Sequence, residues 1–207
     1  MVTFCPSEGC VLISLTLQPE PANFATDVRA PGSVFLRSTP RPSSEQFKRH
    51  RYWSVCLPDL KNSYRSLCAY SCLPINTQGS VDHYLPKTAY PRLAYEWSNF
   101  RLCMDRINNY KGESQLVLDP FVVKTDWFQL DLATLFVRPN PSLQKLVHDR
   151  VVTTIRVLKL NLDDQLVQLR FDAYNSYLRG DWSLDYLQTW YPFIAHEVIR
   201  QAPKPTA

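Results

Sequence analysis

The sequence predicts an α+β fold in which a unit of two short strands and a helix lies between helical segments. Apolar residues recur at helical spacing in residues 59–67 and, over three further segments, in residues 143–198. Between them, short apolar runs are separated by turns rich in Pro, Asn and Gly, a pattern typical of strands. Helices at both ends with strands in the middle define the predicted class.

We expect residues 1–45 to form a proline-rich irregular arm. Six prolines interrupt this stretch, and Pro both fixes φ and removes a backbone donor. Within the arm, residues 29–36 are expected to hold one short extended piece after a Pro-Gly turn. Beyond it, Ser43 or Ser44 can cap a helix, and a second helix is expected from about Asp59, with Pro58 at its first turn.

The central stretch predicts strands, a loop and a short helix. A turn at residues 76–79 is expected between two antiparallel strands, the second ending at His83. An irregular loop with two prolines follows, residues 99–102 are expected to return to the sheet, and a helix over 105–110 stops at Gly112. We place the boundaries of this domain at residues 46 and 125.

Residues 126–207 predict a mostly helical subdomain. Extended segments are expected in residues 116–121, 127–132 and 136–141, before the pattern becomes helical from Leu143. A second helix is expected to be capped by Asp163 or Asp164 and stopped by Gly180, and a third to be capped by Ser183 and kinked at Pro192. Their apolar stripes are expected to form the core of a small bundle or a surface for a partner protein.

Bulk composition narrows the class of protein. The formal net charge of +4 is mild, but the stretch from position 37 to position 65 contains seven Lys or Arg residues and only two acidic residues. Such a cluster serves either a solvated helix face or contacts with nucleic acid. Six irregularly spaced cysteines predict reduced thiols and a cytoplasmic location, and the lack of a long apolar run predicts no membrane contact.

Four polar residues between Val81 and Gly112 are spaced for metal-assisted hydrolysis. His83 is suited to act as a general base, and Asn99, or its carbonyl, to orient the imidazole. Asp82 and Asn108 offer hard oxygen ligands to Mg²⁺, or to Mn²⁺, which would polarise a phosphodiester. Taken singly, each of these residues has an ordinary structural alternative.

Four sequence blocks together resemble the HNH endonucleases, also called His-Me finger or ββα-metal nucleases. The blocks are DHYLPK, YPRLAYEWSNFRL, NNYKG and LDPF, and the resemblance covers residues 52–121. It implies a ββα-metal core over residues 46–125, with His83 and Asn99 catalytic and Asp82 and Asn108 as metal ligands. It also implies phosphate contacts by Lys87 and Lys111, for which simple solvation is the alternative.

The chain departs from the family at the structural zinc site. Many relatives bind zinc with two Cys-x-x-Cys pairs, whereas this chain has Cys68 and Cys72 with Cys103 out of register. Tetrahedral zinc needs four Cys or His ligands. We therefore expect apolar packing by Leu67, Met104 and Ile107 to replace structural zinc, with zinc on the three cysteines as the less favoured alternative.

The resemblance implies a metal-dependent endonuclease that cuts nucleic acid, with DNA the expected substrate. Small HNH proteins of this outline resemble the nuclease subunits of Septu-type and retron-associated antiphage systems, in which an ATPase partner controls cutting. The competing hypothesis is a catalytically inactive HNH-like module for nucleic-acid binding or complex assembly. The intact set of Asp82, His83, Asn99 and Asn108 favours the enzyme.

Overall fold

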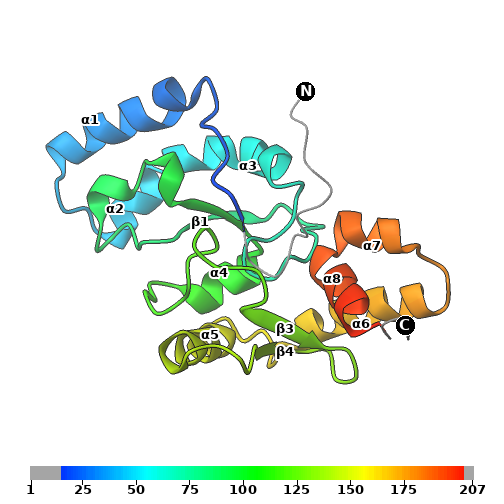
Figure 1. The fold of residues 1–207 in the computed structure, drawn as a ribbon. Helices are drawn as coiled ribbons and strands as arrows, with labels where there is room; N and C mark the ends of the chain where they lie inside the picture. Colours follow the sequence, from blue (N-terminus) through cyan, green and yellow to red (C-terminus); the bar gives the residue numbers. More distant parts are fainter. Residues whose placement is uncertain (1–14, 203–207) are drawn as a thin grey trace.

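The computed structural model describes residues 15–202 and places two small antiparallel sheets among helices (Figure 1). Helices account for 48% of the residues and strands for 10%, which confirms the predicted α+β class. The predictions for residues 1–14 and 203–207 lie outside the described residues. Within the described range, no helix combines the length and the apolar character that crossing a bilayer requires.

The expectation of an irregular arm is wrong for residues 25–38. A π-type segment, η1 (Ala25–Arg29), leads directly into the helix α1 (Ala30–Ser38), where an extended piece was expected. Pro31 falls in the first turn of α1, at the change from π to α turns. Gly32 lets α1 pack tightly, because a Cβ there would lie 2.2 Å from Cγ of Tyr95.

The next two helices form where local signals predict them. Ser43 and Gln46 form a reciprocal capping box at the start of α2 (Ser44–Arg49). A 3₁₀ turn, η2 (Tyr52–Cys56), follows, and Pro58 occupies the first turn of α3 (Leu57–Ser63). These elements bring Phe47 and Trp53 into one aromatic cluster with Tyr95.

The central sheet pairs differently from the prediction. Strand β1 (Ser80–His83) pairs antiparallel with β2 (Phe100–Cys103), with Ser80 opposite Cys103 and His83 opposite Phe100. The expected return of the chain near residues 99–102 is thus confirmed, but a strand pair across the turn at 76–79 is wrong. Before that turn only an isolated bridge joins Leu67 to Pro74, and Pro cannot extend a ladder because it has no N–H.

Two short 3₁₀ turns and one helix complete the central unit. The loop between the strands contains η3 (Pro91–Leu93) and η4 (Trp97–Asn99), and β2 leads directly into α4 (Asp105–Lys111). Gly112 ends α4 with φ +50°, as predicted. Because α4 packs against β1, the end of β1 and one face of α4 border the same region.

The C-terminal region consists of a hairpin and four helices. Strands β3 (Phe128–Asp131) and β4 (Phe136–Pro139) pair with each other, while residues 116–121 form no strand. The helices are α5 (Lys145–Val157), α6 (Asp164–Leu178), α7 (Leu184–Trp190) and α8 (Pro192–Gln201). Asp163 and Ser183 cap α6 and α7 as predicted, whereas Pro192 starts a separate helix instead of kinking one.

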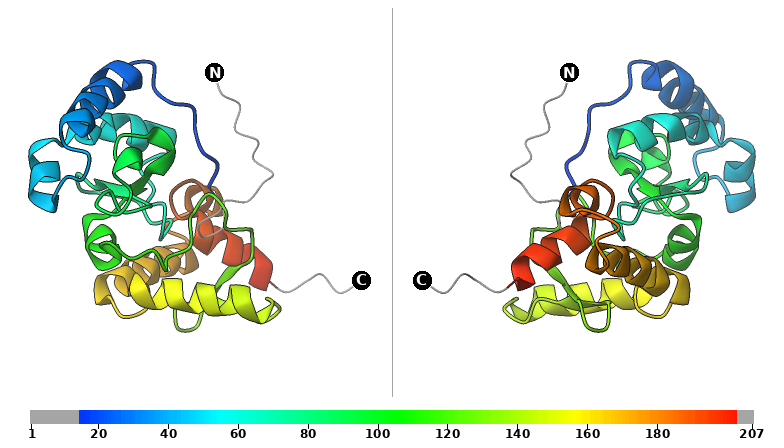
Figure 2. Two further views of the ribbon diagram at one scale, coloured as in Figure 1. Left: turned by 90° about the vertical axis from the view of Figure 1, so that its left-hand side faces the viewer. Right: turned by 90° about the vertical axis from the view of Figure 1, so that its right-hand side faces the viewer.

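The helices cover opposite sides of the central unit. Figures 1 and 2 show α1–α3 on one side of β1, β2 and α4, and the β3–β4 hairpin with α5–α8 on the other. The hairpin packs against α5 and α8, and α6, α7 and α8 pack against one another. The predicted boundaries between three regions stay a prediction.

Candidate functional site

A polar cavity of about 530 Å³ opens beside the end of β1. Its walls come from the α2–η2 segment, the turn before β1, β1 itself, the following loop and α4. Four of the residues predicted to belong to the site line it together: Asp82, His83, Lys87 and Asn108. Asn99 and Lys111 lie behind this wall and act on the site through other groups.

The imidazole of His83 is held in one tautomer by a backbone carbonyl. Its Nε2 lies 2.9 Å from the carbonyl oxygen of Ala94, and because a carbonyl can only accept, Nε2 carries the proton. The ring packs edge-on against Trp53 and Phe100, with centroids 4.7 and 5.2 Å away. Nδ1 is thus the ring nitrogen that can accept a proton.

The environment of His83 keeps the ring neutral. Burial lowers its pKa to about 3, the positive charge of Lys87 contributes in the same direction, and the hydrogen bond to Ala94 only partly opposes them. His83 nevertheless lines the cavity, with 6% of the residue exposed. At neutral pH the site therefore presents an uncharged imidazole as a proton acceptor.

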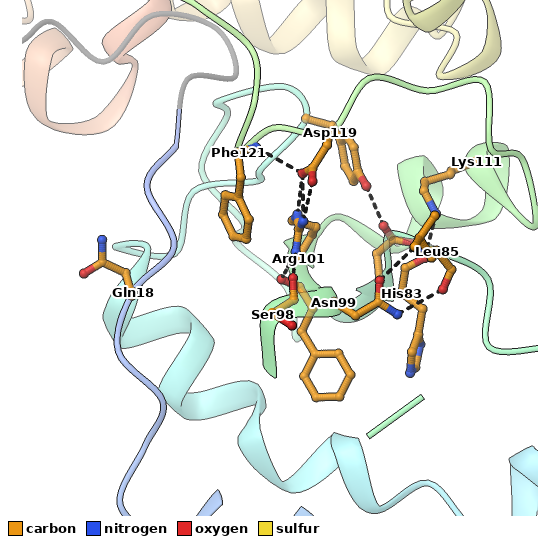
Figure 3. Close-up of polar contacts among 12 residues, drawn as sticks. Gln18, His83, Leu85, Ser98, Asn99, Arg101, Lys111, Asp119 and Phe121 are labelled. Carbon is orange, nitrogen blue, oxygen red and sulfur yellow. Dashed lines mark hydrogen bonds and ion pairs between the residues drawn. The ribbon is translucent and has the colours of Figure 1, made fainter. Parts of the chain in front are cut away.

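Asn99 braces the loop that orients His83. Its Oδ1 accepts from the N–H of Leu85 at 2.8 Å, and its Nδ2 donates to the carbonyl of Leu85 at 3.0 Å (Figure 3). The same Nδ2 also donates to the carbonyl of Leu93 at 3.2 Å. Leu93 directly precedes Ala94, whose carbonyl holds the imidazole. The sequence suggested a carbonyl from Asn99 itself, whereas the hydrogen bonds of Asn99 reach His83 through this loop.

Asp82 is buried between two donors that come from different elements. Its Oδ2 accepts from the hydroxyl of Tyr70 at 2.6 Å, and its Oδ1 from Nζ of Lys111 at 2.9 Å. Lys111 also donates to the carbonyl of His83 at 2.8 Å and its side chain is fully buried (Figure 3). Lys111 thus holds the end of β1 to α4 instead of reaching toward a phosphate in the cavity.

Tyr70 and the Ala94 carbonyl are the site groups that sequence reasoning missed. Burial and the charge of Asp82 raise the pKa of Tyr70, so its hydroxyl remains a donor to the carboxylate. No spacing signal marked Tyr70, which lies among buried residues of the LCAYSC stretch. The sequence cannot indicate which backbone carbonyl binds the imidazole, because every residue carries one.

Asn108 presents an oxygen from α4. Its Nδ2 donates to Oγ of Ser80 at 3.0 Å, and its Oδ1 accepts no hydrogen bond from residues 15–202. Asp82 and Asn108 both line the cavity, and carboxylate and amide oxygens are ligand types that suit Mg²⁺. A metal ion bound by Asp82 would have to share the carboxylate with the ammonium group of Lys111.

A buried ion pair fastens the LDPF segment to the sheet. Arg101 donates to both carboxylate oxygens of Asp119, at 2.7 and 2.8 Å from one nitrogen, and its guanidinium lies 3.6 Å from the ring centroid of Phe121. Arg101 is opposite Asp82 in the β1–β2 register. This pair positions the sheet that carries Asp82 and His83, without lining the cavity.

The cysteines considered for zinc are all buried. Cys68 and Cys103 share a hydrogen bond, and burial raises the pKa of Cys103. Over residues 15–202, no group of three or more His, Cys, Asp and Glu side chains is arranged to hold a metal ion. Leu67, Met104 and Ile107 are buried. That their packing replaces a structural zinc stays a prediction.

Comparison of this chain with protein-family models and with curated proteins gives no match. The chemical function of the site is therefore inferred from its own residues. These are a neutral imidazole with one free nitrogen, two oxygen donors on adjacent elements, and lysine and arginine side chains around one polar cavity.

Proposed function

We propose that this protein is a metal-dependent HNH endonuclease with a ββα-metal core, which hydrolyses phosphodiester bonds of nucleic acid, DNA being the expected substrate. One observation carries the proposal: His83 lines a polar cavity with its Nε2–H bound to the Ala94 carbonyl and its Nδ1 available. Asp82 and Asn108, the residues that the family resemblance gives as metal ligands, line the same cavity.

In this mechanism His83 removes the proton from the attacking water. Nδ1 accepts that proton, and the positive charge that develops on the ring is stabilised by the Ala94 carbonyl through Nε2–H. In the free protein, burial and the charge of Lys87 make His83 a weak base. A bound phosphate would bring negative charge to the cavity, which favours the ring once it has accepted the proton.

Asp82 and Asn108 would hold the Mg²⁺ or Mn²⁺ ion. Bound there, such an ion supplies Lewis-acid polarisation of the phosphate and stabilisation of the departing oxygen. Lys111 and Tyr70 fix the direction of the Asp82 carboxylate, and Ser80 fixes the Asn108 amide. These contacts keep the two oxygen donors in place without substrate, as preorganised catalysis requires.

A catalytically inactive module for nucleic-acid binding or assembly is the second candidate. The observation that favours it is the saturation of Asp82, because both of its oxygens already accept a strong hydrogen bond and one donor is a cation. An ammonium in this position can stand in for the metal and stabilise the fold without any chemistry.

Plasmid nicking separates the two candidates. We expect the protein to relax supercoiled plasmid in Mg²⁺ or Mn²⁺ and to lose this activity in EDTA. His83→Ala should lower the rate by about 10²–10⁴-fold, the usual contribution of a general base. His148→Ala is the matched control, because His148 lies on α5 with a half-exposed side chain and should nick normally. Equal nicking by the His83→Ala variant would refute the mechanism.

The finer proposal, an effector nuclease in a cytoplasmic antiphage complex with an ATPase, rests on the family resemblance alone. It is tested by purifying the tagged chain from cells that carry its neighbouring genes and identifying the proteins that copurify. An ATPase in stoichiometric amount that stimulates plasmid nicking would support the proposal. Recovery of the chain alone, with full activity, would contradict it.

A further inference from the structure

Arg51 lines the cavity as a cation without a carboxylate partner. No ion pair of Arg51 occurs among residues 15–202, whereas Lys48 and Arg49 on the same segment both pair with Glu45. The backbone of Arg51 is fixed, since its carbonyl accepts from both the N–H and the hydroxyl of Ser54. Its position is therefore set by the start of η2, two residues before Trp53.

Arg51 and Lys87 face the same space. Lys87 lines the cavity with its Nζ 5.5 Å from the centroid of the Trp53 ring. Burial lowers the pKa of Lys87 and the charge of Arg51 lowers it further, while Glu113 and Asp82 act in the opposite direction. Two like charges around one cavity repel each other, and an anion bound between them removes that repulsion.

The cavity offers little to a nucleobase. Trp53 and His83 are the aromatic residues of its lining, but each is 6% exposed, and the Trp53 ring already packs against His83 and Lys87. Base stacking needs an accessible aromatic face. Cationic side chains line the cavity beside the carboxylates of Asp82, Asp105 and Glu113, and these cations suit phosphate, which carries the same charge at every nucleotide and no sequence information.

We propose that Arg51 and Lys87 form a phosphate clamp that binds the backbone of the strand beside the phosphate facing His83, independently of base sequence. This inference rests on the proposed function for the identity of the ligand, a nucleic acid. The new element is Arg51, which makes the α2–η2 segment a part of the substrate-binding surface. Lys48, which also lines the cavity, has a side chain that is 73% exposed and is paired with Glu45.

The test measures binding, not cleavage, in the His83→Ala background. A fluorescein-labelled 20-base-pair DNA duplex is titrated with protein by fluorescence anisotropy at several KCl concentrations. Arg51→Gln should weaken binding on the order of tenfold, the loss typical of one charged contact. It should also reduce the slope of log K against log salt by about one, since one fewer phosphate is neutralised.

Two further variants make the result specific. Arg49→Gln removes the same charge two residues away. The Arg49 side chain is 74% exposed and paired with Glu45, so this variant should leave the salt slope unchanged. Arg51→Lys should retain the slope of the parent chain, which a merely structural role for Arg51 would not predict. A second duplex of unrelated sequence should give the same affinity and the same slope.

The outcomes distinguish this inference from the proposed nuclease activity. If Arg51→Gln and Arg49→Gln change the salt slope equally, or if neither changes it, the phosphate clamp is wrong. Plasmid nicking then still tests the proposed nuclease activity separately. If Arg51→Gln alone changes the salt slope but the unmodified chain never nicks plasmid, the phosphate clamp is supported and the proposed nuclease activity is refuted. Absence of duplex binding by the parent chain overturns the clamp.

Discussion

The buried neutral state of His83 predicts a specific dependence of stability on pH. The pKa of His83 falls from an ordinary 6.5 to about 3 in the folded protein, so the unfolded chain binds the proton more tightly. The stability that His83 contributes is therefore complete above pH 6.5 and declines as pH falls from 6.5 toward 3. Each pH unit within that window costs about 1.4 kcal/mol.

The magnitude is large enough to measure by urea unfolding. Between pH 7 and pH 5 the His83 contribution should fall by about 2 kcal/mol. In His83→Gln, which keeps a donor for the Ala94 carbonyl, this part of the pH dependence should vanish, whereas His148→Gln should retain it. A parent chain and a His83→Gln variant that lose the same free energy of unfolding between these pH values would refute the buried neutral imidazole.

Further substitutions test the packing behind the site. Lys111→Met should lower the free energy of unfolding by about 3–5 kcal/mol, because it leaves the Asp82 carboxylate buried and uncompensated, and adding Asp82→Asn should recover most of the loss in urea unfolding. Gly32→Ala should cost about 1–3 kcal/mol in the same assay, since its Cβ would overlap Tyr95, and a stabilised variant would contradict this packing. Asn99→Ala should destabilise the chain by about 1–3 kcal/mol and also reduce nicking, and unimpaired nicking would show that the loop needs no brace.

Much of the fold could be predicted because its signals are local. Ser43, Asp163 and Ser183 each satisfy backbone donors within the next turn, so a capping residue followed by an apolar pattern is enough to place a helix start. Gly112 and Gly180 both have positive φ at helix ends, a conformation that their residue type predicts. The hairpin of β3 and β4 also forms between neighbouring segments.

The errors occurred where distant contacts override local signals. Pro31 and Gly32 indicate a helix breaker, but Pro31 falls in the first turn of α1 and Gly32 is required by close contact with Tyr95, 63 positions away. Strand β1 was expected to pair across the nearest turn, yet its partner lies beyond a loop of sixteen residues. Local propensity contains no information on either contact.

For the site, the sequence identified residue types better than their roles. Asp82, His83, Lys87 and Asn108 do line one cavity, because β1, its loop and α4 meet there. The supporting groups could not be assigned from spacing. Lys111 was expected to contact phosphate, but the burial that directs it to Asp82 depends on how α4 packs on β1.

The most direct measurement of the central claim is chemical rescue of a variant that lacks the imidazole. Replacement His83→Gly empties the space beside Trp53 and Phe100, next to a cavity open to small molecules. We predict that plasmid nicking in Mg²⁺ is lost in this variant and returns in proportion to added imidazole. Nicking by His83→Gly at the parent rate, with no imidazole present, would contradict the assignment of His83 as the base.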